Sequence, residues 1–114
     1  MWLLWVENHT AFARLAGRQF LSTHELIVVP SVAAAKGALS ERAFDAVLVD
    51  YDLDDGKGVT VVEFARQLDT HLVMIATSPY ADGNAALLAA GTDAACPKMR
   101  FAEIESVLAS VVRC

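Results

Sequence analysis

Hydrophobic residues along this chain of 114 residues follow two alternating patterns. Short apolar runs predict strands buried on both faces, and apolar residues that recur every three or four positions predict amphipathic helices. The predicted strands span Trp2–Val6, Leu26–Val29, Ala46–Val49, Leu72–Ala76 and Ala94–Cys96. The predicted helices span Thr10–Leu21, Ser31–Leu39, Val59–Leu68, Asn84–Ala90 and Phe101–Val111, with Ser31 as an N-cap and Gly91 closing the fourth.

Five strand–helix units in succession predict an α/β fold in a single domain over residues 1–114. Because crossovers between parallel strands are right-handed, the strands should form one doubly wound parallel sheet with helices on both faces. We expect the flavodoxin-like strand order 2-1-3-4-5, with a site at the carboxyl edge beside the first and third strands. Those two strands are followed by the acids Glu7 and Asp50.

Composition narrows the classes of function. Apolar residues make up 55% of the chain, which argues against disorder, and a net charge of −5 with nine scattered basic residues argues against binding nucleic acid. The apolar N-terminal run ends at Glu7, too early for an export signal, and no run reaches transmembrane length. We therefore expect a cytoplasmic protein with no membrane partner, in which Cys96 and Cys114 are ordinary reduced thiols.

Polar side chains follow the predicted strands at one edge of the sheet. They are Glu7 and Asn8 after the first strand, Asp50 after the third, Thr77 or Ser78 after the fourth, and Lys98 after the fifth. Clustered carboxylates favour a hard cation such as Mg²⁺, which accepts oxygen ligands. A carboxylate beside Mg²⁺ can attack a phosphoryl group and form an aspartyl phosphate. A nearby ammonium and hydroxyl would stabilise the transferred group.

This arrangement resembles the receiver domain of bacterial response regulators along the whole chain. Asp50 matches the phosphoacceptor, and the segment Leu53–Gly58 resembles the Leu-Pro-Asp-Gly-x-Gly that follows it in the family. Gly91-Thr92-Asp93 resembles the family's Gly-Ala-Asp, and Lys98 lies seven residues after Gly91, as it does there. The resemblance implies Mg²⁺ ligands at Glu7, Asn8, Asp50 and the backbone carbonyl of Asp52, with Thr77 and Lys98 as partners of the phosphoryl group.

What the resemblance implies for function is two-component signal transduction. A histidine kinase or phosphotransfer protein would phosphorylate Asp50, and Mg²⁺ would assist a switch in the face that binds a downstream protein target. The chain would not be an enzyme beyond its own phosphorylation and dephosphorylation. Homodimers through the fourth and fifth helices are common in the family, although nothing in this sequence specifies one.

Several positions depart from the family pattern. Asn8 replaces an acid that usually ligates Mg²⁺, so the metal should bind weakly, and Ala95 replaces an aromatic switch residue. Met99 replaces the usual proline after Lys98. These departures favour an alternative, a pseudo-receiver that binds its partner without phosphorylation. A third alternative is a phosphatase, because Asp50-Tyr51-Asp52 resembles the Asp-x-Asp of haloacid-dehalogenase-type enzymes, where the motif instead follows the first strand of a larger domain.

Overall fold

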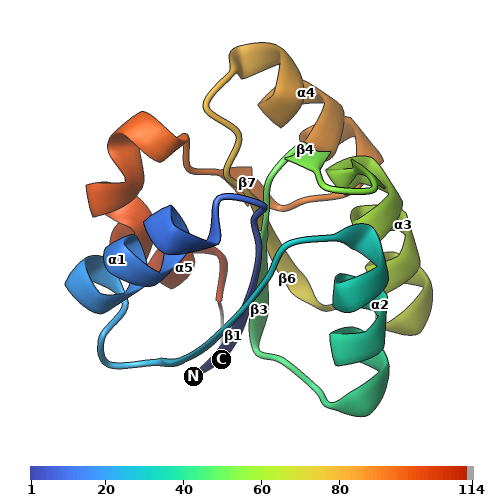
Figure 1. Ribbon diagram of the computed structural model, residues 1–114, viewed down its shortest axis with the longest axis horizontal. Helices are drawn as coiled ribbons and strands as arrows, with labels where there is room; N and C mark the ends of the chain where they lie inside the picture. Colours follow the sequence, from blue (N-terminus) through green and yellow to red (C-terminus); the bar gives the residue numbers. More distant parts are fainter. Residues whose placement is uncertain (113–114) are drawn as a thin grey trace.

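The computed structural model describes residues 1–112 and confirms the predicted α/β fold (Figure 1). Five parallel strands form one sheet in the order β2-β1-β3-β6-β7, which is the predicted order 2-1-3-4-5 of the main strands. They are β1 (Trp2–Val6), β2 (Glu25–Val29), β3 (Ala46–Val49), β6 (Val73–Ala76) and β7 (Ala94–Ala95). Cys114, expected to be a reduced thiol, lies outside the described residues.

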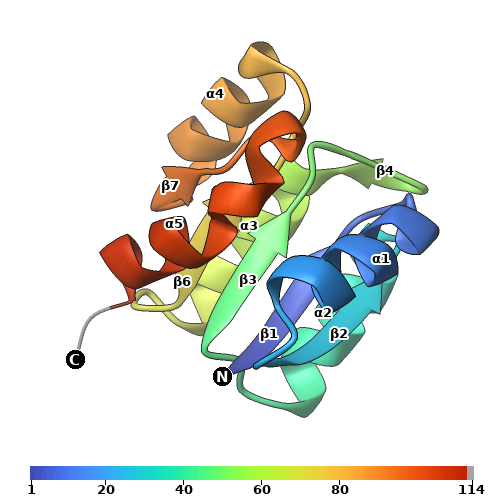
Figure 2. The ribbon, with the colours of Figure 1, turned by 90° about the vertical axis from the view of Figure 1, so that its left-hand side faces the viewer.

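Helices cover both faces of this sheet. They are α1 (Thr10–Phe20), α2 (Val32–Glu41), α3 (Gly58–Leu68), α4 (Ala81–Ala90) and α5 (Ile104–Val111), with the 3₁₀ helix η1 (Lys98–Glu103) directly before α5. Figures 1 and 2 show α1 and α5 on one face and α2, α3 and α4 on the other. Within residues 1–112 no helix is both long and apolar enough to cross a membrane.

Alternate residues of each strand feed two separate cores, because successive side chains of a strand point to opposite faces. Leu4 and Val47 pack with α2, α3 and α4, whereas Trp5 and Leu48 pack with α1, η1 and α5. All four side chains are fully buried. Burying a side chain of this size contributes roughly 1.5–3 kcal/mol, so both cores fix the sheet against its helices.

The strand register brings the residues after β1, β3 and β6 into one row. Val6 pairs with Val49, which pairs with Ala76. The ladder continues one step further, because the Asp50 N–H donates to the Val6 carbonyl and the Thr77 N–H to the Val49 carbonyl, both at 2.9 Å. The next residues along the three strands are therefore neighbours across the sheet edge.

Three local features were not predicted. The loop after β3 contains a small antiparallel hairpin of β4 (Asp52–Leu53) and β5 (Gly56–Lys57). Helix α4 begins at Ala81, three residues before the predicted start at Asn84. The last predicted helix, Phe101–Val111, begins in the 3₁₀ helix η1 and becomes α-helical only at Ile104; η1 itself is kinked at Arg100, whose φ/ψ values of −116° and 24° are non-helical.

Two helix-end predictions are confirmed. The Ser31 hydroxyl accepts the Ala34 N–H at 3.0 Å, as an N-cap does, and Gly91 ends α4 with a φ of 131°. This φ disfavours any residue with a side chain, so the glycine is needed to turn the chain toward β7.

Candidate functional site

Two buried carboxylates and one lysine meet at the carboxyl edge of the sheet. Glu7 follows β1 and is 0% exposed, and Asp50 follows β3 and is 4% exposed. The Lys98 ammonium, from the segment after β7, lies 2.7 Å from Glu7 Oε1 and 3.0 Å from Asp50 Oδ2. One ammonium thus faces two carboxylates, which leaves an excess negative charge in the site.

The other oxygen of each carboxylate is held by the backbone. Glu7 Oε2 accepts the His9 N–H at 3.0 Å, and Asp50 Oδ1 accepts the Tyr51 N–H at 2.7 Å. The His9 ring also approaches Glu7, with Nδ1 3.4 Å from Oε2. Each carboxylate is therefore oriented by a rigid backbone donor on one side and by a flexible lysine side chain on the other.

Burial and charge act in opposite directions on the two ionisable partners. Burial raises the pKa of Glu7, and the nearby Asp50 charge raises it further, although Lys98 and the His9 N–H lower it. For Lys98, burial acts to lower the pKa, but hydrogen bonds to Glu7 and Asp50 outweigh it and raise the pKa overall. Lys98 therefore stays protonated and provides a fixed positive charge at the site.

Two polar atoms at this edge are buried with neither a hydrogen bond nor an ion pair. They are Asn8 Oδ1, beside Glu7, and Thr77 Oγ1, in the same row as Asp50, whereas Glu7 Oε1 has only its ion pair with Lys98. Leaving such a group unpaired costs about 1–3 kcal/mol, and native structures retain few of them. Trp5 Nε1 and Thr92 Oγ1 are also unpaired, but Trp5 lies in an aromatic core rather than among charged groups.

The structure distinguishes the two candidate hydroxyls. Ser78 Oγ accepts the Tyr80 N–H at 3.1 Å, and the Asn84 side chain bonds to the backbone N–H and carbonyl of Ser78. Ser78 therefore holds the turn into α4. The Thr77 hydroxyl has no partner, so Thr77 stays the predicted site hydroxyl, with Ser78, whose O–H can still donate, as its alternative.

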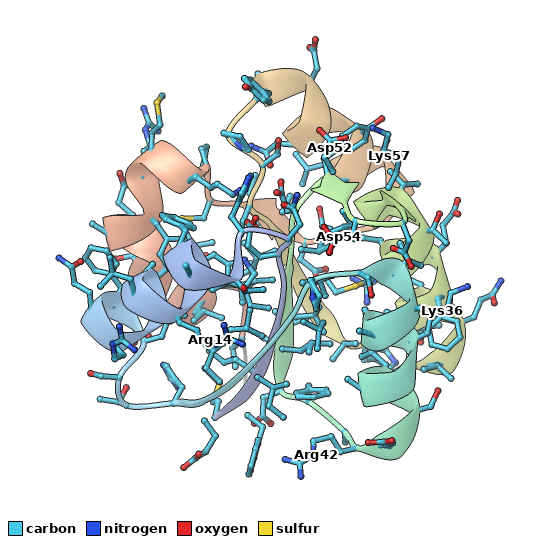
Figure 3. The ribbon with its side chains drawn as sticks, viewed as in Figure 1. Arg14, Lys36, Arg42, Asp52, Asp54 and Lys57 are labelled. Atoms are coloured by element: carbon cyan, nitrogen blue, oxygen red, sulfur yellow. The ribbon has the colours of Figure 1, made fainter. Side chains whose placement is uncertain are left out.

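The loop after Asp50 passes very close to the site. The Gly58 N–H donates to the Tyr51 carbonyl at 2.6 Å, and a Cβ on Gly58 would lie 1.9 Å from the Asp50 carbonyl oxygen. Only glycine fits there. The Asp52 carboxylate is exposed and pairs with Lys57 on the hairpin (Figure 3), so its side chain is engaged outside the buried site.

The role of Asp55 was not predicted from the sequence. Its two carboxylate oxygens accept the N–H groups of Val32 and Ala33 at 2.7 and 3.1 Å, which lowers the pKa of Asp55. Asp55 thereby caps α2 and ties the loop after β3 to it. An Asp-Gly pair signals a turn, but no local pattern reveals a partner 23 residues away.

Comparisons with known proteins support the fold rather than a close relationship. No family model and no curated protein matches the chain. A putative response regulator from Chloroflexus aurantiacus has a TM-score of 0.84 at 21% identity, covering 98% of both chains. A CheY-like receiver domain protein from Methanospirillum hungatei has 0.83 at 21%, covering 96% of this chain and 92% of that one. The chain has the receiver fold.

A third solved structure with the receiver fold contains a metal ion. The receiver domain of the sensor histidine kinase PA1611 from Pseudomonas aeruginosa has a magnesium ion coordinated in its active site cleft. It has a TM-score of 0.83 at 20% identity, and the match covers 97% of this chain and 96% of that one.

The possible metal donors at the carboxyl edge of this chain are all oxygen atoms. Residues 1–112 contain no cluster of three or more His, Cys, Asp or Glu side chains that could hold a metal. The available donors are the carboxylates of Glu7 and Asp50 with the unpaired amide oxygen of Asn8. Such an all-oxygen set fits Mg²⁺ and not a soft metal. Lys98 contacts both carboxylates, so its ammonium competes with any cation bound between them.

Proposed function

We propose that this chain is a receiver in two-component signalling, in which Asp50 accepts a phosphoryl group from a histidine kinase or a phosphotransfer protein. The observation that carries the proposal is the contact of one buried ammonium, Lys98, with both Glu7 and Asp50 at 2.7 and 3.0 Å. An ion pair kept for stability alone needs only one carboxylate. A second buried carboxylate that lacks its own cation is explained if the site binds a metal ion and an anionic group.

In the proposed reaction an Asp50 carboxylate oxygen attacks the phosphorus of a phosphohistidine. The new P–O bond forms as the P–N bond breaks, and the released imidazole nitrogen takes up a proton. Lys98 offsets the negative charge that would otherwise repel the two anions. Thr77 supplies the free hydroxyl, and Mg²⁺, held by Glu7, Asn8, Asp50 and the Asp52 carbonyl, would neutralise charge on the phosphoryl oxygens.

The switch would then run through η1, because Ala95 leaves no aromatic side chain to relay it. Lys98 is the first residue of η1, and Phe101 in the same turn stacks on Trp5 with ring centroids 4.4 Å apart. When the phosphoryl group draws Lys98 away from Glu7, η1 and this stacked pair should shift. The face of α5, which follows η1, would present the change to a downstream protein.

The test uses acetyl phosphate or beryllofluoride with Mg²⁺, followed by amide-resolved NMR of the full chain. We expect shifts at Glu7, Asp50, Thr77 and Lys98 that extend to Phe101. Asp50→Asn should abolish them. Asp54→Asn is the matched control, because Asp54 is an exposed carboxylate of the same loop (Figure 3), and it should respond as the unmodified chain does.

A second candidate function is favoured by one observation. Asn8 leaves the site with one carboxylate fewer than the family pattern, and Lys98 already occupies the two that remain. A pseudo-receiver of this kind would bind its partner constitutively. It predicts that Mg²⁺ and beryllofluoride leave the NMR spectrum unchanged. That result would also overturn the first proposal.

A further inference from the structure

A groove of about 600 Å³ runs along β2 at the outer edge of the sheet, and none of its lining residues belongs to the acidic site. Leu26 and Val28 of β2 line it together with Arg14 and Arg18 of α1. Figure 2 shows β2 at this edge with α1 beside it. The groove therefore combines an edge strand with a basic helix surface.

The backbone of β2 is available for pairing along this groove. The Glu25 N–H donates to the Met1 carbonyl, and the Val29 carbonyl accepts the Glu7 N–H, both at 2.9 Å. In a parallel ladder alternate residues bond to the same neighbour, so Leu26 and Val28 direct their N–H and C=O groups away from β1. Among residues 1–112 no strand pairs with β2 on that side.

Apart from one charged residue at its start, Glu25, this edge also lacks the usual protection. Edge strands are normally short, or they carry charges or prolines that prevent pairing with another chain. The opposite edge, β7, has only two residues. β2 has five, and its last four are the half-buried apolar residues Leu26, Ile27, Val28 and Val29.

The basic side of the groove determines which kind of strand could pair with β2. Arg14 and Arg18 are exposed and form no ion pair or side-chain hydrogen bond within residues 1–112. They are one helical turn apart, a rise of about 6 Å. Side chains on one face of a strand repeat at about 6.6 Å. Acidic residues two positions apart in an added strand would therefore match the spacing of the two guanidinium groups.

His24 is not a third free cation in this groove. Its Nε2 lies 2.6 Å from Glu105 Oε1 of α5, and its Nδ1 lies 3.2 Å from the N-terminal amine. The attraction for an acidic ligand therefore comes from Arg14 and Arg18.

We propose that the β2 edge binds an extended, acidic segment of a partner protein as an added strand. The partner backbone would pair with Leu26 and Val28, and Asp or Glu residues two apart would contact Arg14 and Arg18. A second copy of this chain suits the edge less well. Antiparallel pairing of two β2 strands about a two-fold axis would bring the arginines of both copies to the same face of the joined sheet, where they repel. The proposal uses no residue of the acidic site.

The test titrates the full chain with a blocked peptide of alternating Val and Glu, followed by amide-resolved NMR and hydrogen exchange. We expect saturable binding and slowed exchange at the Leu26 and Val28 amides. Two control peptides are a Val–Lys version and a Val–Glu version with alternate backbone nitrogens methylated. Equal binding of either control, or no binding of the Val–Glu peptide, would overturn the proposal.

Variants separate the arginines from general charge effects. The double change Arg14→Gln and Arg18→Gln should weaken peptide binding by about tenfold or more. The matched control, Lys36→Gln with Arg42→Gln, removes the same charge elsewhere (Figure 3) and should leave binding within about twofold. Asp50→Asn should have no effect on peptide binding. A failure of the β2-edge proposal is therefore distinguishable from a failure of the receiver proposal. Concentration-dependent dimerisation that protects Leu26 and Val28 without peptide would assign the edge to a second copy.

Discussion

At the amino end of the central sheet, Asp45 and Asp93 accept backbone N–H groups of Trp2 and Met74 at 2.7 and 2.9 Å. At the carboxyl end, Glu7 and Asp50 also accept one backbone N–H each, but their remaining oxygens share the Lys98 ammonium. The same residue types thus have different surroundings at the two ends.

The difference lies in how the carboxylate charges are balanced. At the amino end Arg66 joins the network, donating to the Gly91 carbonyl at 2.7 Å and pairing with Asp93 at 3.0 Å. At the carboxyl end Asn8 Oδ1 and Thr77 Oγ1 have no partner. At the amino end Thr92 Oγ1 is also unpaired, but there Asp93 has Arg66 as its own cation, whereas the two buried carboxylates of the carboxyl end share one. The carboxyl end therefore retains the capacity to bind a further cation.

The largest expected effect is at the carboxyl end, with Lys98→Met. Removing the ammonium leaves Glu7 and Asp50 as two buried carboxylates without a cation, which should lower the free energy of unfolding by about 3 kcal/mol at pH 7. Urea unfolding measures this, and Lys98→Arg, which keeps the charge, should lose much less. A loss below about 0.5 kcal/mol would show that the lysine does not balance both acids.

The pH dependence of Lys98→Met tests the same point. The pKa of Glu7 is raised already, and losing Lys98, which lowers it, should raise it further. The folded state then binds a proton that the unfolded state releases, so stability should fall as pH rises from about 4.5 toward the raised pKa. If Lys98→Met lost the same free energy of unfolding at low pH as at neutral pH, this prediction would be wrong.

Arg66→Ala should have the next largest effect, and on stability alone. It removes the hydrogen bonds to Gly91 and the ion pair with Asp93, at a cost of about 2 kcal/mol. Phosphoryl uptake at Asp50 should be unchanged. Arg14→Ala is the control, because Arg14 is exposed, and it should change stability by less than about 0.5 kcal/mol.

Asn8→Asp would add a carboxylate at the carboxyl end. Mg²⁺ should bind about tenfold more tightly, because Mg²⁺ favours anionic oxygen ligands, and the metal-free protein should become less stable from charge repulsion. An NMR titration with Mg²⁺ measures the first effect and urea unfolding the second. Unchanged affinity would place Asn8 outside the metal site.

The smallest expected effects on stability concern the two adjacent hydroxyls of Thr77 and Ser78. Ser78→Ala should cost about 1 kcal/mol, because Ser78 Oγ accepts the Tyr80 N–H. Thr77→Val should be nearly neutral for stability, since its hydroxyl has no partner to lose. Beryllofluoride binding should show the reverse order, with Thr77→Val the weaker binder. If Ser78→Ala weakens it more, Ser78 is the hydroxyl used.

The order and type of the main elements follow from local patterns in the amino-acid sequence. Apolar runs such as Ala46–Val49 and helical spacing after Gly58 are such patterns, and the crossover rule turns them into one parallel sheet. That topology also predicts Glu7 and Asp50 at one edge, because both follow parallel strands that are neighbours in it. Cap residues such as Ser31 could be recognised because their partners lie within one turn.

Which polar groups are paired and which are free depends instead on the folded chain. The contact of Lys98 with both Glu7 and Asp50, the cap of α2 by Asp55, and the different hydrogen bonding of Thr77 and Ser78 were not predictable from local patterns. The position of β2 at the sheet edge follows already from the predicted strand order, but which of its backbone groups face outward depends on the register of the folded sheet. Periodicity records which face of an element is buried, but hydrogen bonds between distant side chains depend on distances of a few tenths of an ångström that only packing fixes.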